Sequence, residues 1–96
     1  MIEVRQTATF ASWHAALRDR RAAAKITARL ERVAFGNLGD VQPIGGGLSE
    51  LRIHHGPGYR IYLSSQGEVL IVILCGGDKR TQAADIARAK ALAAGL

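Results

Sequence analysis

The spacing of apolar positions is helical near the start of the chain and changes to a period of two further along. Residues 2–5 are typical of a short strand. A helix is expected directly after them, with Thr7 or Thr9 placed to accept its first backbone N–H groups. The apolar positions that mark this helix are Phe10, Trp13 and Leu17.

A second helix is expected to begin after an N-cap at Asp19 and to stop at Gly36-Asn37. Its apolar face is formed by Ala23, Ile26, Leu30 and Val33. A separate, basic face is formed by Arg21, Lys25, Arg29 and Arg32. The short link between the two helices predicts a helical hairpin. The basic face is either a solvated surface or a docking surface for an acidic partner.

The glycine-rich segment 36–47 is predicted to be a loop, and three strands are predicted after it. The first alternates apolar and polar residues over 50–54, and the second does so over 59–63, beyond a turn at Gly56-Pro57-Gly58. The third, residues 69–75, is apolar throughout, which is typical of an interior strand covered on both faces. A last helix is expected after Thr81.

These elements predict one α+β domain over residues 1–96, in the order β-α-α-β-β-β-α. We expect a mostly antiparallel sheet of four strands with the helical hairpin packed on one face. The other face is expected to stay partly open, with the last helix at its edge.

Thirteen Lys and Arg against eight Asp and Glu give a formal net charge of +5, and most of these cations are arginines. Arginine suits bidentate contacts with phosphates and carboxylates, so the partner is expected to be either a nucleic acid or an acidic protein. The single cysteine, Cys75, lies in the apolar run and is typical of a buried thiol in a reducing compartment. No signal peptide and no membrane span are predicted, so we expect a cytoplasmic protein without membrane contacts.

The alternation of apolar and polar residues in these strands also predicts where a catalytic or binding site lies. If the apolar residues of the two alternating strands face the helices, the polar ones share the opposite face. These polar residues are Glu50, Arg52, His54, Arg60 and Tyr62. Asp78-Lys79-Arg80 leaves the next strand beside them, and Arg60 and Lys79 are expected to be exposed. Such a face suits a phosphodiester and its charged transition state, and it equally suits a solvated sheet with cross-strand Glu–Arg pairs.

Metal and nucleotide chemistry are not expected. His54 and His55 are adjacent in a strand, so their side chains point to opposite faces and cannot bind one metal ion together. The glycine runs precede no G-K-[ST] and no G-x-G-x-x-G string, so no nucleotide cofactor is predicted.

Two strings give the chain a resemblance to a known family: E-L-R-I-H-H-G-P-G-Y-R over 50–60 and G-G-D-K-R-T-Q over 76–82. Together they resemble the RelE/ParE toxin superfamily, and most closely its HigB-like "addiction module killer protein" branch. The likeness also takes in Phe10, Trp13, Leu17 and residues 36–40, so it covers nearly the whole chain. It implies a microbial-RNase-like fold and the toxin of a type II toxin–antitoxin pair. The expected activity is a metal-independent, ribosome-dependent endonuclease that cuts mRNA and is neutralised by a small helix-turn-helix antitoxin similar to HigA.

The resemblance implies catalytic roles for four residues. Arg60 corresponds to the arginine that binds the scissile phosphate, and Lys79 to a basic residue at the phosphate or the leaving group. Glu50 and Arg52 fall where RelE-like toxins place basic residues that assist removal of the 2′-hydroxyl proton. Glu50 is therefore either a general base or only the ion-pair partner of Arg52.

Candidate substrate-binding residues are Tyr62, Arg80, His54, Arg29 and Arg32. RelE-like toxins often stack a base on a tyrosine of the last helix, and some HigB-like ones end in a catalytic histidine. This chain has neither, and Tyr62 is our candidate for the missing base contact. Two alternatives therefore remain: a ParE-like toxin that binds DNA gyrase without cutting RNA, or a degenerate toxin that binds only its antitoxin.

Overall fold

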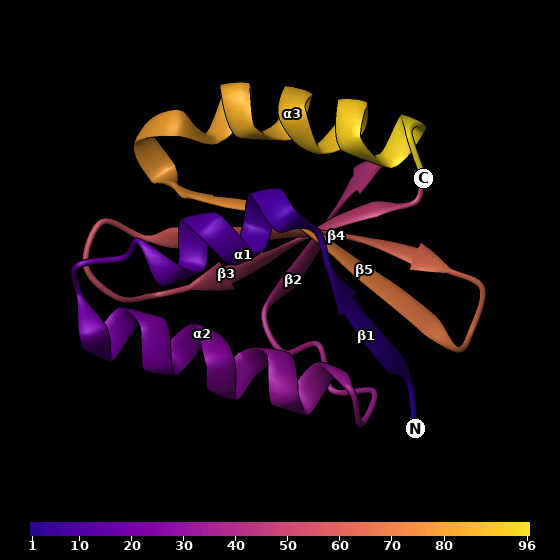
Figure 1. Ribbon diagram of the computed structural model, residues 1–96, viewed down its shortest axis with the longest axis horizontal. Coiled ribbons are helices and arrows are strands. Elements are labelled where there is room, and N and C mark those ends of the chain that lie inside the picture. Colours follow the sequence, from indigo (N-terminus) through magenta and orange to yellow (C-terminus); the bar gives the residue numbers. More distant parts are fainter.

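A computed structural model describes residues 1–96 and shows an α+β fold, in agreement with the predicted class (Figure 1). Three α-helices, one 3₁₀ turn (η1) and a five-stranded sheet make up the chain. In chain order the elements are β1 (Glu3–Gln6), α1 (Ala8–Ala15), α2 (Arg20–Val33), β2 (Val41–Gly45), β3 (Leu48–Ile53), β4 (Tyr59–Gln66), β5 (Leu70–Asp78), η1 (Lys79–Thr81) and α3 (Gln82–Ala94). No helix has the length and apolar character that crossing a membrane requires.

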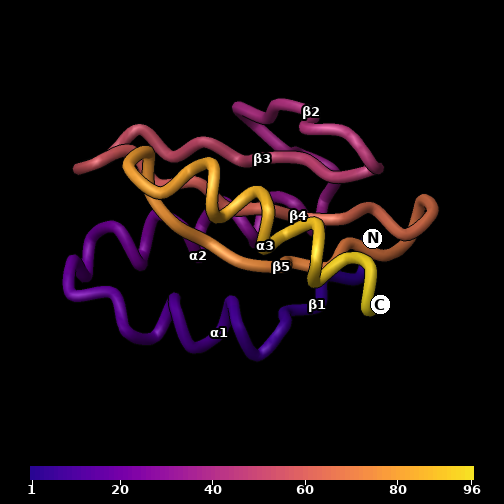
Figure 2. The backbone as a smooth tube through the Cα atoms, turned by 90° about the horizontal axis from the view of Figure 1, so that it is seen from above, coloured from indigo at the N-terminus to yellow at the C-terminus, as the bar shows by residue number.

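The sheet is mixed, and its strands lie in the order β1-β5-β4-β3-β2, which Figure 2 shows from the α3 side. Strand β1 runs parallel to β5, and the other three pairings are antiparallel. The interior position of β5, between β1 and β4, agrees with its continuous apolar sequence.

The prediction of four strands was wrong, because the predicted loop 36–47 contains strand β2. The glycines and Pro43 obscure this strand in the sequence. Proline is tolerated there because β2 is an edge strand, and the pairing with β3 is irregular between Pro43 and Gly45.

Both predicted helix caps at the start of the hairpin are present. Thr7, rather than Thr9, caps α1: its Oγ1 accepts a hydrogen bond from the backbone N–H of Phe10 at 3.0 Å. The Asp19 carboxylate caps α2 by accepting from the backbone N–H groups of Arg21 and Ala22 at 3.0 and 3.1 Å. These hydrogen bonds also hold the pKa of Asp19 below its usual value, together with a hydrogen bond from His55.

Apolar side chains form a core on each face of the sheet. The larger core lies between the sheet and the α1–α2 hairpin, and Phe10, Ile26, Leu51, Ile61 and Ile73 are fully buried in it. The smaller one lies beneath α3 and contains Leu48, Tyr62, Val72, Leu74, Cys75 and Ala89. Helix α3 therefore covers the face that was predicted to stay partly open, and Figure 1 shows it on the side of the sheet opposite α2.

Gly76 and Gly77 end the interior strand β5 where large side chains approach it from both sides. A Cβ atom added at Gly76 would lie 2.6 Å from Cε3 of Trp13, on the hairpin side. One added at Gly77 would lie 2.7 Å from Cγ of Asp85, on the α3 side. The Asp85 carboxylate is buried there and accepts a 2.5 Å hydrogen bond from the Thr81 hydroxyl. The two glycines therefore let α1 and the start of α3 pack directly on the strand.

We expect Gly76→Ala and Gly77→Ala each to lower the free energy of unfolding by about 1–3 kcal/mol, the usual cost of overpacking a tight interior. Gly95→Ala is the matched control, because Gly95 has a φ of −90° and its nearest neighbour to an added Cβ is 3.6 Å away. Urea unfolding followed by circular dichroism measures all three. Equal stability of Gly77→Ala and Gly95→Ala would contradict this close packing.

Candidate functional site

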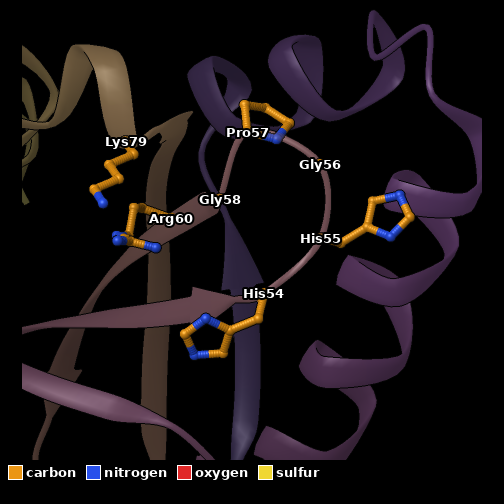
Figure 3. A pocket seen from close by; sticks show the side chains of 7 residues that line it. All are labelled: His54, His55, Gly56, Pro57, Gly58, Arg60 and Lys79. Atoms are coloured by element: carbon orange, nitrogen blue, oxygen red, sulfur yellow. The ribbon is translucent and has the colours of Figure 1, made fainter.

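A cavity of about 530 Å³ opens where the loop between β3 and β4 faces the end of β5 (Figure 3). It is lined by the loop residues 54–58 together with Arg60 of β4 and Lys79 of η1. No carboxylate and no large apolar side chain lines it. The cavity is therefore a cationic, polar hollow at the place where the sequence predicted a phosphate site.

Arg60 and Lys79 come from neighbouring elements and reach the same space. Tyr59 pairs with Asp78 in the antiparallel β4–β5 register, so the start of β4 and the end of β5 lie at the same end of the sheet. Arg60 is the second residue of β4, and Lys79 directly follows β5. Gly58, with a φ of +81°, passes close to both, since a Cβ there would lie 3.6 Å from Nη1 of Arg60 and 3.7 Å from Cβ of Lys79. Lys79 is exposed as predicted, but Arg60 is only 9% exposed, so the prediction of a freely exposed arginine was wrong.

Glu50 accounts for the burial of Arg60. The strand register pairs Glu50 with Tyr62 and Arg52 with Arg60, which confirms that these four side chains share the face opposite the hairpin. The Glu50 carboxylate is 1% exposed, and its Oε1 lies 3.1 Å from Nε of Arg52 and 3.6 Å from Nε of Arg60. Its Oε2 accepts a 2.8 Å hydrogen bond from the Gln82 side chain of α3. Of the two roles left open for Glu50, the structure contains the ion pair, and both carboxylate oxygens are occupied within the protein.

Tyr62 lies in the core beneath α3 and is fully buried. Burial raises the pKa of its hydroxyl well above the ordinary value, and the nearby charges of Glu50 and Asp85 raise it further. A nucleic-acid base cannot stack on this ring in the observed conformation, so the structure offers no replacement for the missing aromatic of the last helix.

The two adjacent histidines point in different directions from the end of β3, as Figure 3 shows. His55 turns toward α2, where its Nε2 lies 2.9 Å from Oδ2 of Asp19. His54 remains exposed at the cavity, and its Nε2 lies 2.5 Å from Oδ2 of Asp40, in the loop before β2. That hydrogen bond holds the pKa of Asp40 below its usual value. Asp40 was not predicted as a site residue, because the likeness over residues 36–40 assigns it no role.

Arg80 is exposed next to Lys79, and its guanidinium is held by Asp78 at 2.9 Å. The hydrogen bonds from Arg80 hold the pKa of Asp78 below its usual value, and the same pairing raises the pKa of Arg80. Arg80 is therefore an exposed cation next to Lys79 whose charge is partly balanced by Asp78, and it does not line the cavity.

The remaining candidates, Arg29 and Arg32, lie on α2 and differ sharply from each other. The Arg29 guanidinium donates to three backbone carbonyls: those of Arg52 at 2.6 Å, Leu38 at 2.8 Å and Asp40 at 3.1 Å. Arg29 therefore fixes the loop before β2 and is not free to bind a substrate through these groups. Arg32 is exposed, and it lines a second cavity of about 210 Å³ that shares His54 with the first.

Cys75 is buried beneath α3, as predicted, and its thiol lies 3.6 Å from the backbone oxygen of Asp85. Burial raises the pKa of this thiol to about 11, and the Asp85 charge adds to the effect. The group has neither the access nor the ionisation that a nucleophile requires.

No protein-family model matches the chain. A protein of Haemophilus influenzae that carries the description "Uncharacterized protein" is 52% identical to it over 92 residues. The aligned region covers 96% of this chain and 93% of the relative. The chain belongs to the same family as this relative.

We expect Arg29→Ala to lower the free energy of unfolding by about 2–3 kcal/mol, because it leaves three carbonyls without their charged donor. Arg32→Ala, one turn further along the same helix and exposed, should change it by less than about 0.5 kcal/mol. Thermal or urea unfolding measures both. If the two variants are equally stable, the loop is not held by Arg29.

Proposed function

We propose that the chain is the toxin of a type II toxin–antitoxin module, a cytoplasmic, metal-independent endoribonuclease that cuts mRNA on the ribosome. The observation that carries the proposal is the pairing of Arg60 and Lys79 on one polar cavity that contains no carboxylate. The net charge of +5 and the resemblance of residues 47–63 and 76–82 to the RelE/ParE toxins support it. So does the α+β fold, which a RelE-like toxin requires.

In the proposed reaction the 2′-hydroxyl of the substrate attacks the adjacent phosphate. Arg60 contacts the phosphate oxygens that gain charge in the transition state, and its partner Glu50 fixes the guanidinium in place. Lys79, exposed beside Arg60 in Figure 3, donates a proton to the leaving 5′-oxygen. In this proposal three neighbouring arginines contact flanking phosphates. Arg52 pairs with Arg60 in the sheet, Arg80 follows Lys79, and Arg32 lines the adjoining cavity.

The proposed partners are the ribosome with its mRNA and a small helix-turn-helix antitoxin similar to HigA. A domain of 96 residues whose candidate site is a cavity of about 530 Å³ has little surface for holding an RNA strand in register. A ribosome that presents the mRNA in a fixed conformation supplies this positioning. The basic face of α2 suits either ribosomal RNA or an acidic antitoxin segment.

One observation favours a second candidate, a ParE-like toxin that binds DNA gyrase. No Phe, Tyr or Trp lines the cavity, and Tyr62 is buried, so the surface lacks the aromatic platform on which a base usually stacks. A cationic surface without such a platform also suits an acidic protein partner. A toxin that binds only its antitoxin would show neither activity.

Pulse labelling after induced expression distinguishes the candidates. An mRNA endonuclease stops incorporation of labelled methionine first, and primer extension then finds new 5′ ends within coding sequence. A gyrase-binding toxin stops thymidine incorporation first and leaves the mRNA intact. Early loss of thymidine incorporation with intact mRNA would therefore contradict our proposal, and normal growth with antitoxin binding would identify the degenerate form.

We expect Lys79→Ala to slow mRNA cleavage by roughly 100-fold, the usual effect of removing one group that stabilises transition-state charge. It should leave the free energy of unfolding unchanged, because Lys79 is exposed. Lys90→Ala, an exposed lysine on α3 remote from the cavity, is the matched control and should cleave as the unmodified protein does. Single-turnover cleavage on programmed ribosomes measures both, and equal rates for the two variants would remove Lys79 from the site.

A further inference from the structure

The proposed reaction needs a group that accepts the 2′-hydroxyl proton, and Glu50 is not available for it. Its carboxylate is 1% exposed beneath α3, and Arg52, Arg60 and Gln82 occupy its two oxygens. Arg60 and Lys79 are cations under physiological conditions and carry no free lone pair. The acceptor must therefore be sought among the other residues of the cavity.

His54 is the one residue there with the required chemistry and access. Its side chain is 73% exposed and borders both cavities. In Figure 3 its ring lies beside Arg60, with one ring nitrogen on the side of Arg60 and the other directed away from it. His55 is excluded, because its ring turns toward α2 and is engaged by Asp19.

Asp40 determines which nitrogen of His54 is free. The lowered pKa of Asp40 keeps this group a carboxylate, which only accepts hydrogen bonds, so Nε2 of His54 must carry the hydrogen. In that tautomer Nδ1 is the nitrogen with a lone pair, and no hydrogen bond of the structure occupies it. The pair thus has the arrangement in which a carboxylate orients an imidazole base.

The position of Asp40 is itself fixed by the fold. Its backbone oxygen accepts hydrogen bonds from the backbone N–H of Arg52 at 3.0 Å and from the guanidinium of Arg29 at 3.1 Å. Gly39 has a φ of +65°, and an added Cβ would lie 3.0 Å from Nη2 of Arg29. These contacts hold the loop against β3 and so fix the position of the Asp40 carboxylate beside the His54 ring. An ion pair between two mobile surface side chains has no such fixed geometry.

We propose that His54 is the general base of the cleavage reaction and that Asp40 is its positioning residue, an inference that rests on the proposed function. Nδ1 of His54 takes the proton of the 2′-hydroxyl while the 2′-oxygen forms its bond to phosphorus. The bond from phosphorus to the 5′-oxygen breaks, and Lys79 supplies the proton that this oxygen needs. The products are a 2′,3′-cyclic phosphate and a 5′-hydroxyl end, and the two residues regain their starting protonation from water.

Single-turnover cleavage on programmed ribosomes, at saturating protein, tests the assignment. His54→Gln should lower the cleavage rate by roughly 100-fold or more, the usual range for loss of a general base. Its affinity for the ribosome should stay within about threefold of the unmodified protein, since glutamine keeps the polar character of the surface. Lys90→Ala, an exposed residue of α3 that does not line the cavity, is the control and should cleave normally.

Asp40→Asn tests whether Asp40 acts only by orienting His54 or takes part in the cleavage reaction directly. It should slow cleavage less than His54→Gln does, and the double variant should be no slower than His54→Gln alone, because Asp40 acts only through the imidazole. A double variant that is slower than His54→Gln would overturn the positioning role. Circular dichroism and antitoxin binding should be the same for all of these variants.

The pH dependence gives a readout that a structural role would not change. The cleavage rate should rise with pH over the range in which an imidazole loses its proton, and this rise should be absent from His54→Gln. The charged and titratable groups around His54 are Asp40, Lys25, Arg29, Arg32, His55, Arg60 and Lys79. His54→Gln leaves all of them in place, so loss of the rise in this variant assigns it to His54.

The outcomes of these tests are distinct. If the unmodified protein leaves ribosome-bound mRNA intact, the proposed function fails and the inference fails with it. If the unmodified protein cleaves and His54→Gln cleaves within about threefold of it, only the assignment of His54 is overturned. A slow His54→Gln whose pH profile keeps its rise would also overturn it.

Discussion

A carboxylate buried beneath α3 requires compensation from several elements at once, and Glu50 obtains it from β3, β4 and α3. Removing a charge from water costs several kcal/mol unless oppositely charged and hydrogen-bonding groups replace the solvent. Arg52, Arg60 and Gln82 meet this requirement. The same contacts connect the second face of the sheet to the last helix and hold the Arg60 side chain at the cavity. The position of Arg60 at the cavity therefore follows from the contacts that compensate the buried charge of Glu50.

Much of the fold follows from spacing alone. The period of two predicted which residues of β3 and β4 share a face, and the register confirms it for Glu50, Arg52, Arg60 and Tyr62. Strand β2 was missed because Pro43 and the glycines around it resemble a loop, and only its position at the sheet edge allows it to pair. The position of α3 was also missed, since a weakly amphipathic, alanine-rich helix does not indicate which surface it covers.

The error about α3 explains the errors about the site. A face that is open to solvent would leave Arg60 and Tyr62 free, whereas a face under a helix buries both. Asp40 and Gln82 both lie in segments that resemble the toxin family, but the sequence assigned them no role. Their contacts, across 14 and 32 positions of the chain, become visible only in the structure. For Arg29 the sequence indicated a binding role that the contacts do not support. Its helical spacing places it on a basic surface, but its guanidinium is hydrogen-bonded to three backbone carbonyls.

Strand β1 and strand β5 are neighbours in the sheet although 63 residues separate the end of one from the start of the other. Because β5 is also the strand on which both helical layers pack, the N-terminal segment has no sheet to join until the last quarter of the chain exists. Folding during synthesis must therefore wait for near completion of the chain. Lys79 follows β5 directly, so a product that terminates before residue 70 lacks both this interior strand and a lysine that lines the cavity. Under the proposed function, a copy that terminates before β5 is therefore inactive.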